Sequence, residues 1–142
     1  MKRVLLLAEG RLRDPGLRAP IDDYYRRCSH RFRVEEREVR DLTALKRALP
    51  GRGEGLVVTL DERGRQHRSR EFARLLSDWL ERAPLTLVIG GADGLDDDVR
   101  ARADHLLSLS KMTLAHRLVR LVLAEQLYRA VSILDGAPYH RG

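Results

Sequence analysis

The stretch LTLVIG at residues 85–90 is a short apolar run that stops at a pair of glycines. Two further runs have the same character, VLLLA at 4–8 and LVVTL at 56–60, and each is followed by a charged residue. A continuous apolar run bounded in this way is typical of a strand buried on both faces, as in a parallel sheet. These three segments therefore predict the centre of a parallel sheet.

Helical patterns lie between the predicted strands. Two segments place apolar residues on one helical face, namely Leu17, Ile21, Tyr24, Tyr25 and Cys28 in the first, and Phe72, Leu75, Leu76 and Trp79 in the second. The segment FRVEEREV at 32–39 alternates apolar and polar residues, which predicts a strand near an edge of the sheet. Strands and helices alternate, so we expect one α/β domain over residues 1–142, with a mostly parallel sheet and helices on both faces.

The chain of 142 residues has a formal charge of +6, with 24 arginines and 3 lysines spread along its length. This charge favours a polyanionic partner, although an ordinary solvated arginine surface explains it equally well. The single cysteine excludes an internal disulfide. The apolar run at 4–8 is too short for a signal-peptide core or a membrane span, so we expect a cytoplasmic protein with no membrane partner.

Several kinds of site find no support in the motifs. The run GGADG at 90–94 is neither G-x-G-x-x-G nor a Walker A loop, and the five histidines lack metal-ligand spacing. The acidic run at 96–98 is explained by the start of a helix. We therefore expect no metal. Gly90 and Gly91 fall where ligands of open parallel sheets bind, although a purely structural turn is an equal alternative.

The stretch LSLSKMTLAHR at 107–117 contains no turn glycine and lies between two helical patterns. Its alternation of small hydroxyl and apolar residues predicts an extended segment whose backbone groups are open to a ligand, most simply a flat heteroaromatic ring. A tightly packed connector is the alternative. The helix predicted over 116–134 has apolar residues on more than one face, which favours a symmetric dimer over a second face covered by a loop.

Four segments together carry a specific resemblance. They are VTLDERG at 58–64, LVIGGADGL at 87–95, LSLSKMTLAHRLVRLVLAEQLYRA at 107–130 and PYHR at 138–141. In this order they resemble the ribosomal RNA large-subunit methyltransferase H family, within the trefoil-knotted SPOUT methyltransferases. GRLRD at 10–14 resembles the opening of the same family.

The resemblance implies a homodimer with a C-terminal trefoil knot, which uses S-adenosylmethionine to methylate N3 of a pseudouridine in large-subunit ribosomal RNA on assembled ribosomes. Two alternatives remain open. One is a dimer of the same fold that binds RNA or ribosomes without catalysis. The other is a SPOUT methyltransferase with a different RNA target, because a fold alone does not determine a substrate.

The resemblance also implies roles for individual residues. The residues expected to bind the cofactor are Leu60, Gly90, Leu109, Ser110, Lys111, Met112, Thr113 and Leu114. The residues expected to bind the substrate are His116, Arg120, Tyr139 and Arg141. His140 is expected to serve as the catalytic base or to orient the substrate. Family members usually carry proline where this chain has Ala115, so we expect a less rigid loop here.

Overall fold

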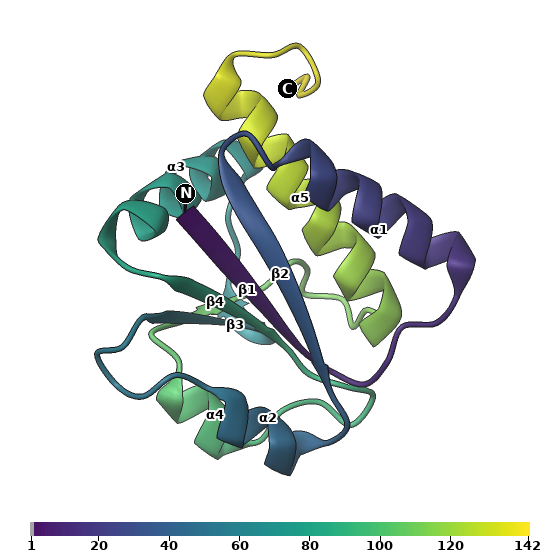
Figure 1. Ribbon diagram of the computed structural model, residues 1–142, viewed down its shortest axis with the longest axis vertical. Coiled ribbons are helices and arrows are strands. Elements are labelled where there is room, and N and C mark those ends of the chain that lie inside the picture. The colour runs from purple at the N-terminus through teal and green to yellow at the C-terminus, as the bar shows by residue number, and fades with distance from the viewer. Residues whose placement is uncertain (1) are drawn as a thin grey trace.

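The computed structural model describes residues 2–142 and shows five strands and five helices (Figure 1). The strands are β1 (Lys2–Glu9), β2 (Phe32–Val39), β3 (Leu56–Arg65), β4 (Leu85–Ile89) and β5 (His105–Leu107). The helices are α1 (Pro15–Arg27), α2 (Leu42–Ala48), α3 (Ser69–Arg82), α4 (Asp97–Arg102) and α5 (His116–Asp135). The alternation of strands and helices predicted from the sequence is confirmed.

The strands form one sheet in the order β2-β1-β4-β3-β5, and every neighbouring pair is parallel. All five residues of β4 are buried, as its apolar sequence predicts. The alternating strand β2 lies at one edge, which is also confirmed. The other edge is β5, a strand of three residues that the sequence did not reveal.

Helices cover both faces of the sheet, and successive side chains of β1 pack against the helices on opposite faces. Leu6 packs in the core formed with α3 and α5, whereas Leu7 packs against α2 and α4 on the opposite face. Figure 1 shows the same division, with α1, α3 and α5 on one side and α2 with α4 on the other. Burying such a leucine contributes about 1.5–3 kcal/mol, so β1 stabilises both layers.

Several helix ends are fixed by their capping residues. The Asp96 carboxylate accepts a hydrogen bond from the Val99 amide at 3.0 Å, so the acidic run at 96–98 does begin a helix. Helix α5 ends at Gly136, whose φ of 70° lies in the left-handed region that favours glycine. Within residues 2–142, no helix has the length and apolar character needed to cross a membrane.

Candidate active site

A cavity of about 490 Å³ opens at the carboxyl edge of the sheet. Its walls are the end of β3, the turn after β4, the loop between β5 and α5, and the first turn of α5. Parallel strands end together at this edge, which is where open α/β sheets bind ligands. The volume falls within the range of small-molecule and cofactor sites.

Most of the residues expected to bind a cofactor line this one cavity. They are Leu60, Gly90, Leu109, Ser110, Met112, Thr113 and Leu114. Lys111 is exposed and does not line the cavity. The structure thus brings together three segments that lie far apart in the sequence.

The turn after β4 packs too closely for larger residues. A Cβ atom at Gly90 would lie 2.8 Å from Cγ of Leu95, and one at Gly91 would lie 2.5 Å from a carboxylate oxygen of Glu9. Contacts this short would force neighbouring atoms to move, so glycine allows the turn to fold against the end of β1. This close packing shapes one wall of the cavity.

The loop 108–115 bends at Leu109, Lys111 and Met112 instead of running fully extended as predicted, and it is held by its own hydroxyl groups. Ser108 Oγ donates to the Ser110 carbonyl at 2.9 Å, and the Met112 amide donates to Ser110 Oγ at 2.9 Å. Thr113 Oγ1 donates to Glu62 at the end of β3, also at 2.9 Å. In the part of the chain that the structure describes, the backbone groups of Leu109 and Leu114 have no hydrogen-bond partner. They are available to a ligand in the cavity.

Acidic residues surround the cavity, and the sequence analysis did not single them out. Asp61 and Glu62 line it, and the Asp61 carboxylate is 2.6 Å from Arg100 Nε. Glu9, at the end of β1, has one buried oxygen without a partner in residues 2–142. Burial raises the pKa of Glu9, and the nearby carboxylates of Asp93 and Asp41 raise it further. The sequence position of Glu9 could have indicated it, because Glu9 ends a strand that neighbours β4 in the sheet.

His116 and Arg120, two residues expected to bind substrate, occupy different surroundings although both belong to α5. His116 lines the cavity at the first turn of the helix. Arg120 is enclosed, with 3% of its side chain exposed, and its Nη2 lies 2.6 Å from Glu38 Oε2. A direct contact between Arg120 and a substrate therefore does not fit its position, because the guanidinium is already bound inside the protein.

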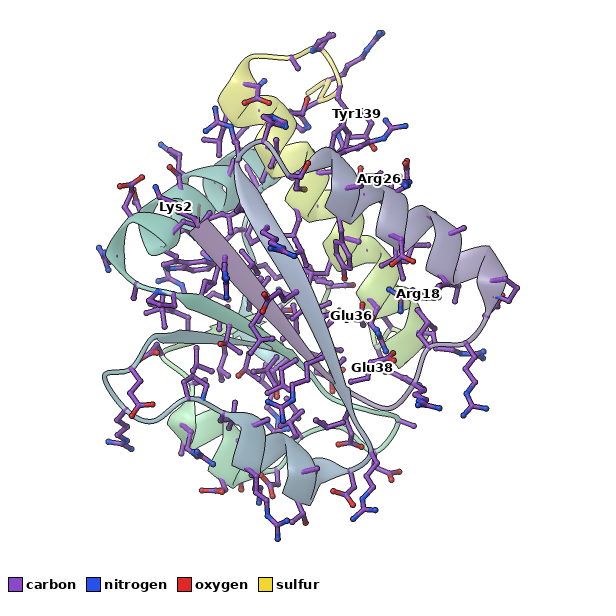
Figure 2. All side chains as sticks on the ribbon, viewed as in Figure 1. Lys2, Arg18, Arg26, Glu36, Glu38 and Tyr139 are labelled. Carbon is purple, nitrogen blue, oxygen red and sulfur yellow. The ribbon has the colours of Figure 1, made fainter. Side chains whose placement is uncertain are left out.

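The C-terminal tail packs at the opposite end of α5 from the cavity (Figures 1 and 2). The Tyr139 hydroxyl donates to Glu125 at 2.7 Å, and Arg129 Nη1 lies 3.0 Å from His140 Nδ1. Arg141 is exposed beyond them. Glu125 and Arg129 lie about 14 and 20 Å along α5 from His116, and neither they nor the tail residues line the cavity. The structure therefore does not bring Tyr139, His140 or Arg141 to the cavity of their own chain.

Other reactive groups are placed in ways that do not suggest a catalytic role. Cys28 is buried at the end of α1, and burial raises the pKa of its thiol to about 12. Within residues 2–142, no group of three or more His, Cys, Asp or Glu side chains is arranged to hold a metal ion. The chemical resources at the cavity are therefore open backbone groups, apolar surface and a few carboxylates.

Comparison with known proteins identifies the family that this chain matches. Residues 1–140 match the model of a family described as "Predicted SPOUT methyltransferase". The chain is 46% identical to the ribosomal RNA large subunit methyltransferase H of Roseobacter denitrificans, over 98% of this chain and 99% of that protein.

Solved structures show the same fold at lower sequence identity. A probable methyltransferase from Bordetella pertussis Tohama I superposes with a TM-score of 0.54 at 15% identity, covering 92% of this chain and 95% of that one. An rRNA methyltransferase from Sinorhizobium meliloti, solved with AdoMet bound, gives a TM-score of 0.50 at 14% identity, covering 94% and 57% of the two chains.

Proposed function

The chain belongs to the SPOUT methyltransferases and, within them, to the ribosomal RNA large subunit methyltransferase H family, and on that premise we propose its reaction and its substrate. The enzyme transfers a methyl group from S-adenosylmethionine to large-subunit ribosomal RNA. We propose that the acceptor is N3 of a pseudouridine and that the RNA is methylated in the assembled ribosome.

The observation that carries this proposal is the cavity at the carboxyl edge of the sheet. It is lined by seven of the eight residues expected to bind the cofactor. Its chemistry fits S-adenosylmethionine, because apolar side chains such as Leu60 and Leu109 suit a flat adenine ring and the open backbone groups of the loop 108–115 suit its polar edge. Carboxylates at the cavity suit a ligand that carries a sulfonium and an ammonium group.

The cofactor supplies a methyl group that is already activated by the positive sulfur. The protein then has two tasks, which are to align the methyl group with the acceptor nitrogen and to receive the imide proton. Backbone groups of the loop 108–115 and the turn at Gly90 perform the alignment. His116, on the cavity wall, orients the entering nucleotide. In this proposal His140 receives the proton at Nδ1 after that nitrogen has left Arg129, with Tyr139 stacking on the extruded base and Arg141 meeting phosphate.

This assignment requires a second protomer, because Tyr139 and His140 pack against Glu125 and Arg129 of α5, about 14 and 20 Å along the helix from the cavity of their own chain. We propose a homodimer in which the tail of one protomer completes the cavity of the other. The apolar belt of α5 supports it, since Leu118 and Val122 lie one turn apart and are 46% and 36% exposed. Exposed apolar side chains at this spacing are typical of a helix that packs against a partner.

We also propose that the C-terminal part forms the trefoil knot of the family, with α5 passing through the loop formed by the preceding segment. Its support is the family membership together with the position of α5, which packs between α1 and α3 after the chain has already built the rest of the sheet (Figure 1). A knot would hold the loop 108–115 in place in addition to the hydrogen bonds of Ser108, Ser110 and Thr113.

Two measurements test the proposal together. Calorimetry with S-adenosylmethionine should show binding that weakens when Gly90 is replaced by valine, since that side chain would enter the turn at the cavity. Mass spectrometry of nucleosides from ribosomes treated with the enzyme should show one methylated pseudouridine. A methyl group on any other nucleoside would still support methyltransferase activity but would overturn the proposed acceptor.

A further inference from the structure

A partly buried charge network lies where α1, β2 and α5 meet, and Arg120 is its most enclosed member. Arg120 Nη2 is 2.6 Å from Glu38 Oε2 and 3.1 Å from Glu36 Oε1, and Arg18 Nη1 is 2.7 Å from Glu36 Oε1. Figure 2 shows Arg18, Glu36 and Glu38 gathered between α1 and the end of β2. Arg18 also pairs with Asp22 at 2.9 Å, so two arginines meet three carboxylates and the network holds no positive charge in excess.

The network also binds the backbone of the loop that follows β1, residues 10–14, which we call the Gly10–Asp14 loop. The Leu12 amide donates to Glu38 Oε2 at 2.8 Å, and Arg120 Nη1 donates to the Gly10 carbonyl at 3.2 Å. The Gly10 amide donates to the Val39 carbonyl at 2.7 Å. The Leu12 side chain is buried with residues of α1 and α5. The loop backbone is therefore fixed at several points.

This fixed loop presents two free cations. Arg11 and Arg13 are exposed on either side of the buried Leu12, and within residues 2–142 neither makes a hydrogen bond or an ion pair through its side chain. Two acidic groups of this region already have partners, because Glu38 binds Arg120 and Asp14 accepts a hydrogen bond from the Gly16 amide at 2.8 Å. The two guanidinium groups are thus available to an external anion.

The loop follows β1 beside the glycine turn that lines the cavity, and its own residues lie outside the lining. Ala8 of β1 pairs in register with Ile89 of β4, so Gly10 follows β1 at the level where the glycine turn follows β4. A Cβ atom at Gly91 would lie 2.5 Å from Glu9, the residue just before the loop. Arg120 lies one helical turn after His116, which lines the cavity. Arg120 therefore anchors the loop to α5, the helix whose first turn lines the cavity.

We propose that the Gly10–Asp14 loop grips the RNA backbone beside the target nucleotide, with Arg11 and Arg13 contacting phosphates and the buried Arg120 acting as the positioning residue that holds the loop in place. This inference rests on the proposed function and names residues that bind its substrate. Arginine is suited to such contacts because its planar fork matches the geometry of a phosphate. Fixing the backbone beforehand reduces the entropy lost when the two side chains bind.

The test compares Arg11→Gln/Arg13→Gln with Arg52→Gln. Arg52 is also exposed and unpaired within residues 2–142. It precedes β3 and therefore lies at the amino-terminal ends of the strands, away from the cavity. Methyl transfer to unmethylated ribosomes is measured over a range of salt concentrations, together with the Kd for S-adenosylmethionine. We expect the double variant to raise KM for ribosomes about fivefold or more and to reduce the slope of log(kcat/KM) against log[salt] by about 1 per lost phosphate contact. Its kcat and its Kd for the cofactor should stay near the wild-type values, and Arg52→Gln should behave as wild type.

The role of Arg120 is tested by combining variants. Arg120→Lys should raise KM for ribosomes in the wild-type background and have little further effect on KM in the Arg11→Gln/Arg13→Gln background, because both changes act through one loop. Equal effects of Arg120→Lys in both backgrounds would contradict the positioning role. Unchanged KM and salt slope in the double variant, or the same change in Arg52→Gln, would overturn the proposed grip. A wild-type enzyme that transfers no methyl group to ribosomes would overturn the proposed function and this inference with it.

Discussion

Thr113 and Glu62 are joined by a hydrogen bond of 2.9 Å that ties the loop 108–115 to the end of β3. The two residues are 51 positions apart in the sequence, and both line the cavity. The bond thus connects two walls of the proposed cofactor site and limits how far the loop can open.

Replacing Thr113 with valine should loosen this connection while keeping the shape of the side chain. A lost hydrogen bond costs about 0.5–1.5 kcal/mol, which corresponds to a roughly two- to tenfold weaker cofactor affinity. Calorimetric titration with S-adenosylmethionine measures the effect. Glu62→Gln is the matched control, because its amide oxygen still accepts the bond, and a loss of affinity as large as that of Thr113→Val would contradict this explanation.

Ala115→Pro should make the same loop more rigid. Ala115 has a φ of −57°, which proline adopts without strain, and it stands just before the first turn of α5. Proline at a compatible position stabilises a protein by about 0.4–1 kcal/mol. We expect a higher Tm and tighter binding of S-adenosylmethionine. A lower Tm would show that the backbone before α5 is not free to accept proline.

Glu9 gives a prediction for the dependence of stability on pH. Burial raises its pKa, the carboxylates of Asp93 and Asp41 add to this, and the Gly91 amide and His116 oppose it. Because its pKa in the folded protein lies above the ordinary value of 4.5, the contribution of Glu9 to stability is complete below that value and is lost as pH rises through the folded pKa.

Glu9→Gln removes this titration, so the variant should be more stable than the wild type at neutral pH. The difference should shrink toward zero below pH 4.5, the ordinary value for a glutamate. Urea unfolding at several pH values between acid and neutral measures it. A variant that is less stable than the wild type at neutral pH would mean that the ionised carboxylate has a favourable partner.

Mixed dimers test whether the tail of one protomer acts on the cavity of the other. We expect His140→Ala and Gly90→Val each to be inactive alone, the first for want of a proton acceptor and the second for want of a cofactor site. Random mixing of the two chains should restore activity at about a quarter of the sites, since half of the dimers are mixed and each has one complete site. A mixture that stays inactive after confirmed subunit exchange would contradict the shared site.

The sheet could be predicted from the sequence because its central strands are continuous apolar runs, which few other structures use. β5 could not be predicted, because its three residues become a strand only through tertiary contacts. The adjoining Asp104 provides these contacts: its amide donates to the Val57 carbonyl at 2.8 Å, and its carboxylate accepts from the Val57 amide at 2.7 Å. No local pattern contains these long-range bonds.

Part of the candidate site could also be predicted from the sequence. The segments that line the cavity carry a family resemblance, and the ends of parallel strands meet at one edge of a sheet. The buried setting of Arg120 depends instead on Glu36 and Glu38, about 80 residues earlier in the chain. The distance of His140 from the cavity depends on which way α5 runs across the sheet, and helical periodicity does not determine that direction.

Transfer of labelled methyl groups from S-adenosylmethionine tests the central claim most directly. The substrates are assembled ribosomes, free large subunits and protein-free ribosomal RNA, all from cells that lack the enzyme. We predict that label appears chiefly on assembled ribosomes and is confined to large-subunit RNA. A cofactor-bound enzyme that labels none of the three substrates would contradict the claim.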